Sequence, residues 1–220
     1  MQNIQIVKRG RPSKVSEVKS FDPSSVKLLR GSELKFNDSL FKPMKTNSEV
    51  DVILSTEGGI MPGTNMVLVG GPGSGKSTVA LDMLSNFTHQ GLKCLFISGE
   101  MDEIAHYKYC KRLPKFACVQ TLFLKNYTDN VKETLEYVFN QGYDIIAVDS
   151  IAEVIEMVKD NYKTTESAAE GWFLQLQDSH KKGNNKGKYY TTFINIQQVT
   201  KAGDFAGSNR LKHMTDAMCH

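Results

Sequence analysis

One short stretch of the sequence combines glycines, a lysine and hydroxyl residues at a spacing suited to binding phosphate. Residues 70–78 read GGPGSGKST and directly follow the apolar run 66–69. Glycines let a loop curl so that successive backbone N–H groups face an anion, and a helix that begins there adds the positive end of its dipole. The pattern GxxxxGK[ST] therefore predicts a P-loop that binds ATP. The predicted nucleotide-binding residues are Gly70, Gly71, Pro72, Gly73, Ser74, Gly75, Lys76, Ser77 and Thr78.

Two side chains of this loop are expected to do separate chemistry. Lys76 would reach the β- and γ-phosphates, and the Ser77 hydroxyl would ligate Mg²⁺. The alternative is a glycine-rich turn that arose by chance. That alternative does not account for the match of four positions together with the preceding strand and the following helix.

Two carboxylates stand at the ends of other apolar runs. Asp149 closes the run 143–149, and Glu100 follows the run 93–98 by two residues. Ligands gather at the carboxyl ends of parallel strands, so Asp149 would hold Mg²⁺, commonly through a water. Glu100 would orient and deprotonate the attacking water. Asp149-Ser150 could instead cap a helix, and Glu100 could equally be a solvated loop acid.

The elements that must position these side chains alternate between strands and helices. Near-continuous apolar runs are typical of strands covered on both faces, so we expect an α/β fold with a mostly parallel sheet flanked by helices. A polar stretch is expected between residues 150 and 164. The predicted strands are 66–70, 93–98, 118–124, 143–149 and 189–198, and the predicted helices are 77–90, 102–113, 129–140 and 165–182.

The composition is that of a protein with one core-forming domain. The 220 residues are 40% hydrophobic and include no apolar run of the ~20 residues that a membrane helix requires. We therefore expect no membrane association and a cytoplasmic location, in a bacterium or in the host if a phage encodes the chain. The cysteines include no CxxC pair, which favours free thiols and no zinc site. They are Cys94, Cys110, Cys118 and Cys219.

Positive charge is concentrated at the N-terminus. Residues 1–47 carry ten Lys/Arg and four Asp/Glu, whereas residues 48–220 carry seventeen and twenty. We expect a basic flexible arm before a mildly acidic core, a balance that favours a polyanionic partner. The segment 8–14, KRGRPSK, resembles an AT-hook, so Arg9 and Arg11 would enter a DNA minor groove or contact phosphates. An inert tail or docking onto a neighbouring subunit are the alternatives.

Longer blocks of the sequence resemble a known family. Residues 57–113 resemble the RecA superfamily, most closely its RadA (Sms) branch, with DnaB-like helicase cores as more distant relatives. The likeness lies in GGxxPG before the first strand, the P-loop, the tripeptide SGE and then Arg112-Leu113. Residues 194–218 are similar to the VTKxG…AG…LEHMxD segment of that branch. The resemblance covers about residues 50–220.

The resemblance implies roles for particular residues. Glu100 matches the family's catalytic glutamate, and Gln198 matches its sensor of the γ-phosphate, where RadA proteins carry a histidine. Gln197 is the alternative if the register differs by one. The segment 199–209 would be a loop that binds single-stranded DNA, and the residues after Asp149 are a weaker candidate, with Lys159 and Lys163. The basic residues in or just beyond the loop are Lys201, Arg210 and Lys212.

The sequence also departs from the family. Where the family carries an N-terminal four-cysteine zinc element, this sequence has the basic arm. The family's basic KNRFG motif and protease-like domain would lie after the second block, and the given sequence stops at His220, so either this is a minimal or truncated member or other groups complete the neighbour's site. A trans-acting finger cannot be assigned, so slow intrinsic hydrolysis is expected, because such a finger contributes about 10³–10⁵ in rate.

The expected function is that of a DNA-dependent ATPase of recombination, repair or replication, working as a helicase, translocase or recombinase. The cofactors would be ATP and Mg²⁺, and the chain would form a ring or filament with ATP at its subunit interfaces. The alternative is a KaiC-like assembly protein that responds to nucleotide without DNA. A small-molecule kinase fits poorly, because no lid or acceptor pocket is evident.

Overall fold

In the computed structural model of this protein, the described residues are 23–181, 190–199 and 208–219. Their contacts divide the chain into two units, Met1–Phe36 and Asn37–His220. The first unit contains two short 3₁₀ helices, Pro23–Ser25 and Gly31–Glu33. The division falls inside the predicted arm, because the second unit includes Met44, whose backbone pairs with that of Ile60 in an antiparallel bridge.

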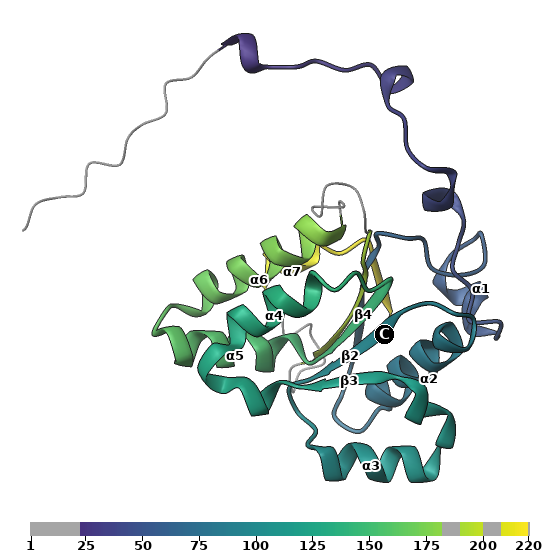
Figure 1. The fold of residues 1–220 in the computed structure, drawn as a ribbon, viewed down its shortest axis with the longest axis vertical. Coiled ribbons are helices and arrows are strands. Elements are labelled where there is room, and N and C mark those ends of the chain that lie inside the picture. The colour runs from purple at the N-terminus through teal and green to yellow at the C-terminus, as the bar shows by residue number, and fades with distance from the viewer. Residues whose placement is uncertain (1–22, 182–189, 200–207, 220) are drawn as a thin grey trace, which may run out of the picture. The chain divides into compact units, whose positions relative to one another are not determined.

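A six-stranded parallel sheet forms the centre of the second unit, in the order β3-β2-β4-β5-β1-β6 (Figure 1). This confirms the predicted α/β fold. Every residue of β2 and β4 is buried, as expected for strands covered on both faces. The strands are β1 Asn65–Gly70, β2 Cys94–Ser98, β3 Gln120–Phe123, β4 Ile145–Asp149, β5 Thr192–Gln198 and β6 Ala217–Cys219.

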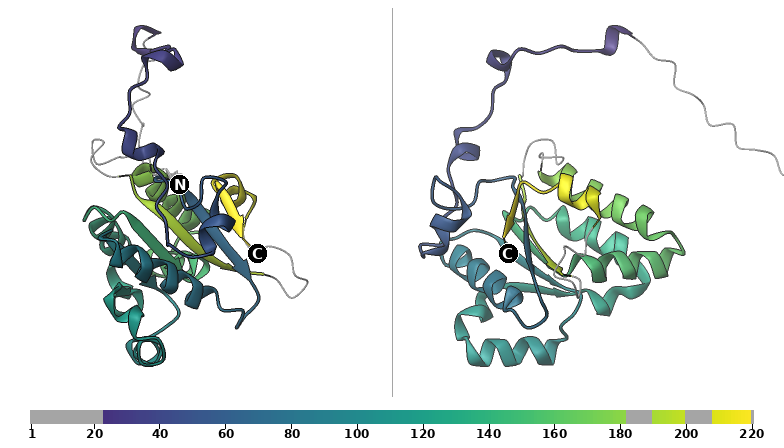
Figure 2. Two further views of the ribbon diagram at one scale, coloured as in Figure 1. Left: turned by 90° about the vertical axis from the view of Figure 1, so that its right-hand side faces the viewer. Right: turned by 180° about the vertical axis from the view of Figure 1, so that it is seen from behind.

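Helices cover both faces of this sheet, as two opposite views show (Figures 1 and 2). α2 and α3 pack on one face, in a core cluster that includes Phe87 and Phe96. α4, α5 and α6 pack on the other face, around Phe139 and Phe173. The helices are α1 Val50–Leu54, α2 Lys76–His89, α3 Glu103–Arg112, α4 Val131–Phe139, α5 Ile151–Tyr162, α6 Glu166–Lys181 and α7 Asn209–His213.

The predicted polar stretch after β4 was wrong, because these residues form α5. Its buried side chains are Ile151, Val154, Ile155 and Val158, which recur at the spacing of one helix face. Ser150 caps the helix, since its hydroxyl accepts a hydrogen bond from the backbone N–H of Glu153. The exposed charged residues between the apolar positions had concealed the pattern.

Parallel pairing brings the carboxyl ends of four strands to the same edge of the sheet. Ser98 pairs with Asp149, and Gly70 pairs with Gln198. Side chains along a strand alternate between the two faces. Asp149 and Gln198 therefore lie on the α2 side, whereas Gln197 lies on the side of α5 and α6.

Candidate nucleotide-binding site

The P-loop joins β1 to α2 in a conformation that depends on glycine. Gly73 and Gly75 have φ angles of 74° and 90°, in the left-handed region that other residues rarely adopt. No side chain caps the first turn of α2, so its N–H groups remain available to an anion. The ammonium of Lys76 lies within the loop and donates to the carbonyls of Gly70 (3.0 Å) and Gly71 (2.8 Å).

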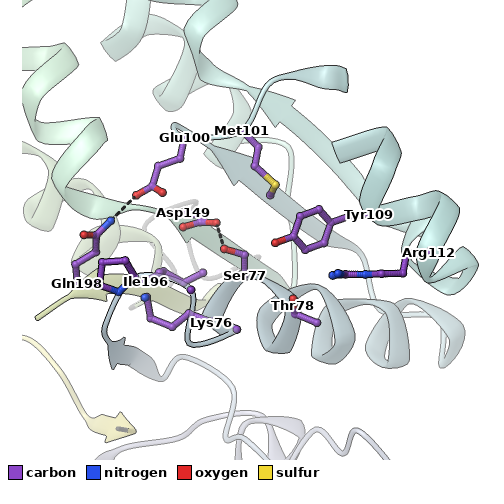
Figure 3. A pocket seen from close by; sticks show the side chains of 13 residues that line it. Lys76, Ser77, Thr78, Glu100, Met101, Tyr109, Arg112, Asp149, Ile196 and Gln198 are labelled. Atoms are coloured by element: carbon purple, nitrogen blue, oxygen red, sulfur yellow. Dashed lines mark hydrogen bonds between the residues drawn. The ribbon is translucent and has the colours of Figure 1, made fainter. Parts of the chain in front are cut away.

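A hydroxyl and a carboxylate meet at the start of α2. The Ser77 Oγ donates to the Asp149 Oδ2 at 2.5 Å (Figure 3). Asp149 is only 2% exposed, and this burial raises its pKa to about 6; the negative charge of Glu100 acts in the same direction, whereas the Ser77 bond and Lys76 oppose it. Paired hydroxyl and carboxylate oxygens are the donors that Mg²⁺ prefers, so both residues fit a magnesium site.

Glu100 stands on a short turn that is held at several points. The Gly99 N–H donates to the carbonyl of Asp149 at 2.7 Å, and the Met101 N–H donates to the Ser98 Oγ at 3.0 Å. The ammonium of Lys125 donates to the Glu100 carbonyl at 2.9 Å. These bonds fix the backbone while the Glu100 carboxylate stays exposed at the pocket.

Gln198 reaches the same carboxylate from β5. Its Nε2 donates to the Glu100 Oε1 at 3.3 Å (Figure 3). Gln197 lies on the opposite face of the sheet and does not line this pocket. Of the two glutamines considered from the sequence, the structure therefore brings Gln198 to Glu100.

These side chains surround a pocket of about 520 Å³. Of the nine predicted loop residues, Gly70, Gly71 and Ser74 do not line it. The predicted residues that line it are Pro72, Gly73, Gly75, Lys76, Ser77, Thr78, Glu100, Asp149 and Gln198.

Sequence reasoning missed the far end of the pocket. Met101, Tyr109 and Arg112 line it beyond the P-loop, and the Arg112 guanidinium lies 5.0 Å from the centre of the Tyr109 ring (Figure 3). A signal was available, because positions 105, 109 and 112 share one face of α3 at the helical spacing of four and three. In the sequence, Arg112 had been noted only for its family spacing.

The two predicted DNA-binding residues that the structure describes, Arg210 and Lys212, do not line this pocket. The Arg210 guanidinium lies against α6, where a Cβ added to Gly171 would be 2.6 Å from its Nη1. Lys212 is exposed on the same short helix, α7. Lys159 on α5 is bonded to Glu156 at 2.5 Å. Three of the predicted contacts lie outside the described residues, namely Lys201, Arg9 and Arg11.

Metal clusters and membrane-spanning helices are both absent from the described residues. Within them no group of three or more His, Cys, Asp or Glu side chains is placed to hold a metal ion. No helix in the same part of the chain has the length and apolarity to span a bilayer.

Comparison with known proteins identifies relatives of this chain. No family model matches it. It is 31% identical to the DNA repair protein RadA of Campylobacter jejuni over 180 residues, which is 79% of this chain and 36% of that protein. RadA of Listeria monocytogenes is 32% identical over 183 residues, 81% of this chain and 37% of that protein. RadA of Chlamydia muridarum is 30% identical over 165 residues, 74% and 34% respectively.

The chain thus spans about a third of the length of the curated relatives it matches. A crystal structure of the flagellar accessory protein FlaH from Methanocaldococcus jannaschii superposes with a TM-score of 0.49 and 11% identity, covering 80% of this chain and 79% of that one. A TM-score and an identity this low do not support any assignment for this chain. The P-loop, the parallel sheet and the RadA relatives all indicate the same family. The chain belongs to the RecA superfamily of P-loop proteins, with a RadA-like core.

Proposed function

We propose that this chain is an ATP hydrolase whose turnover depends on DNA, acting in recombination, repair or replication. The observation that carries the proposal is the bond from Gln198 to Glu100. It joins the side chain suited to activating water to the last residue of β5, directly before the segment expected to contact DNA. A change in the conformation of that segment would be transmitted to Glu100 through the side chain of Gln198.

The hydrolysis follows from the pocket's donors and acceptors. The P-loop amides and Lys76 bind the β- and γ-phosphates and offset the charge that develops during transfer. Ser77 and Asp149 would hold Mg²⁺, which would supply positive charge to offset part of the negative charge of the phosphates. Glu100 orients a water in line with the γ-phosphate and accepts its proton.

The opposite end of the pocket is proposed to hold the base and ribose. The P-loop fixes the phosphates at one end, so the remainder of ATP must extend toward Met101, Tyr109 and Arg112. An aromatic ring with a guanidinium over its face offers a flat, partly apolar surface for a base.

DNA binding and assembly complete the proposal. Single-stranded DNA would be contacted by the segment after β5 and by basic residues around it, through charge neutralisation. The proposed contacts are Lys201, Arg210, Lys212, Arg9 and Arg11. The chain would assemble into a ring or filament with ATP between subunits. A neighbouring subunit would then supply the cationic side chain of the trans-acting finger, on the side of the pocket opposite Glu100. The relatives are DNA repair proteins by name, which supports the repair role.

The test compares ATP turnover with and without single-stranded DNA at several salt concentrations. We expect DNA to accelerate turnover and to bind with a steep salt dependence. Gln198→Ala should retain ATP binding but lose most of the stimulation, and Lys76→Met should lose ATP binding itself. If DNA fails to bind at low salt while ATP changes the mass of the assembly, the KaiC-like alternative is correct.

A further inference from the structure

A second pocket opens at the same edge of the sheet, on the face opposite the nucleotide site. Its volume is about 540 Å³, and it lies between the first turns of α5 and α6, the end of β5 and the start of α7. Its walls include the apolar side chains of Ile151, Ile155 and Leu211. The proposed nucleotide chemistry uses none of these residues.

A buried polar side chain in this pocket lacks a partner. Gln197 is 4% exposed and lines the pocket, and its Oε1 has no hydrogen-bond donor among the residues that the structure describes. Two residues earlier on the same strand, Asn195 is fully bonded to Gln177 and Asn65. A buried acceptor without a partner is unfavourable, so Gln197 is suited to a ligand that donates a hydrogen bond.

The charged residues that line the pocket are all acidic. They are Glu156, Glu166 and Glu170, and within the described ranges no lysine, arginine or histidine lines the pocket. Glu170 is the most buried of the three and accepts a hydrogen bond from the Ser208 Oγ at 2.7 Å.

A nearby cation offsets part of this acidity but does not reach Glu170. Lys159 forms an ion pair with Glu156, and its charge also interacts with Glu166. The Arg210 guanidinium lies against Gly171 and forms no ion pair with these carboxylates in the described part of the chain.

The helix ends at this pocket are also closed to anions. The hydroxyls of Ser150, Thr165 and Ser208 each accept a hydrogen bond from the first turn of the helix that follows. A hydroxyl at this position satisfies an N–H group that would otherwise bind phosphate. Carboxylates and capped helices together exclude a phosphate ligand and favour a cation.

We propose that this pocket binds a guanidinium group, the side chain of an arginine from a protein partner. The planar group would donate to the Glu170 carboxylate and to the Gln197 Oε1, and Glu166 would add attraction. The apolar wall of Ile151, Ile155 and Leu211 suits the methylene stem of arginine. The ammonium of lysine has no planar fork to serve both acceptors.

The test titrates butylguanidinium chloride into the ¹⁵N-labelled full chain and follows the side-chain amide signals of Gln197, assigned with Gln197→Leu. Butylammonium chloride is the matched probe with the same charge and stem. We expect saturable shifts with butylguanidinium and at least fivefold weaker binding of butylammonium. Equal affinities of the two probes, or no saturable shift, would overturn the proposal.

Variants separate the pocket from general surface charge. Glu170→Gln should weaken butylguanidinium binding at least tenfold, while Glu49→Gln, which removes an equal charge from an exposed site elsewhere, should change it less than twofold. Unchanged ATP binding shows that each variant is folded. If Glu170→Gln does not fold, Gln197→Leu replaces it, with the backbone amide signals of Ile155 and Leu211 as the reporters, and should abolish the preference for butylguanidinium. Equal losses in Glu170→Gln and Glu49→Gln would contradict the pocket.

Two additional probes identify the source of the arginine. A peptide of residues 5–16 carries Arg9 and Arg11, and a control peptide replaces both with lysine. If the arginine peptide competes with butylguanidinium and the control does not, a second copy of this chain is the donor. If neither competes but butylguanidinium binds, the donor is another protein. If oligo-dT competes instead, the pocket is a nucleic-acid interface and the proposal is wrong.

Discussion

The two pockets share one strand but present opposite chemistry. Gln198 faces the nucleotide pocket, where Lys76 and the uncapped start of α2 are suited to bind an anion. Gln197 faces the acidic pocket, where the helix starts are capped by hydroxyls. The difference shows that a helix terminus at a sheet edge does not by itself make a phosphate site. The cap residue decides whether the N–H groups are free, and the nearby charges decide which ion enters.

The largest expected effect is a loss of ATP turnover, and it is confined to the nucleotide pocket. Glu100→Gln should lower ATP turnover by about 10²–10⁴, the usual contribution of a general base, and should leave ATP affinity nearly unchanged. Single-turnover rates and calorimetry measure the two quantities. Glu103→Gln, a charge-matched change three residues away on α3, is the control. Normal turnover in Glu100→Gln would falsify the catalytic role.

The buried carboxylate of the nucleotide pocket predicts a pH dependence of stability. The folded pKa of Asp149, about 6, lies above its ordinary value of 3.8. The protonated side chain therefore favours folding below pH 3.8, and this contribution is lost as the pH rises through 6. Without Mg²⁺, the ionised group should cost about 3 kcal/mol above pH 6, at about 1.4 kcal/mol for each pKa unit.

Asp149→Asn should remove that cost. The free energy of unfolding of the metal-free variant should exceed that of the parent chain at pH 8, and the difference should shrink toward pH 4. Urea denaturation across this pH range measures both. Mg²⁺ with ATP should stabilise the parent chain far more than the variant, because the variant lacks the carboxylate. A stability difference that does not vary with pH would contradict the assignment.

A pair of variants sharpens the contrast on the α6 side of the sheet. Gln197→Leu should stabilise the protein by about 1 kcal/mol, because it removes a buried acceptor that has no partner. Gln177→Leu should destabilise it by about 1–3 kcal/mol, because it leaves Asn195 without its bond from α6. Chemical denaturation measures both. Equal losses from the two variants would mean that Gln197 is satisfied in solution.

The smallest expected effect concerns the base end of the nucleotide pocket. Tyr109→Ala should weaken ATP binding about two- to tenfold, in line with about 0.5–1.5 kcal/mol for an aromatic contact. Inorganic triphosphate, which has no base, should bind the variant and the parent chain alike. Tyr107→Ala, an exposed neighbour outside the pocket, is the control. If triphosphate binding falls as much as ATP binding, Tyr109 does not contact the base.

The parts of the site that the sequence predicted are those built from local patterns. The P-loop glycines and the strand that ends at Asp149 can be predicted, because each depends on residues that are neighbours in the sequence. The sequence did not predict α5. Its apolar residues Ile151, Val154, Ile155 and Val158 have helical spacing, but the charged residues between them indicate a polar stretch.

The remaining features depend on distant parts of the chain. Sequence alone could not choose between Gln197 and Gln198, because alternation fixes their relative but not their absolute orientation. Tyr109 becomes a pocket residue only when the fold brings α3 to the same pocket as the P-loop. The acidic pocket combines three helices and one strand, and no local pattern describes that combination.

The adjacent glutamines of β5 give the strand a property like a reading frame. Substituting either residue would change one pocket, but inserting or deleting one residue just before them would exchange the two side chains between the faces. After an insertion, Gln197 would take the place of Gln198 opposite Glu100, and the acidic pocket would lose its glutamine. We therefore expect β5 to tolerate changes of residue type far better than changes of length.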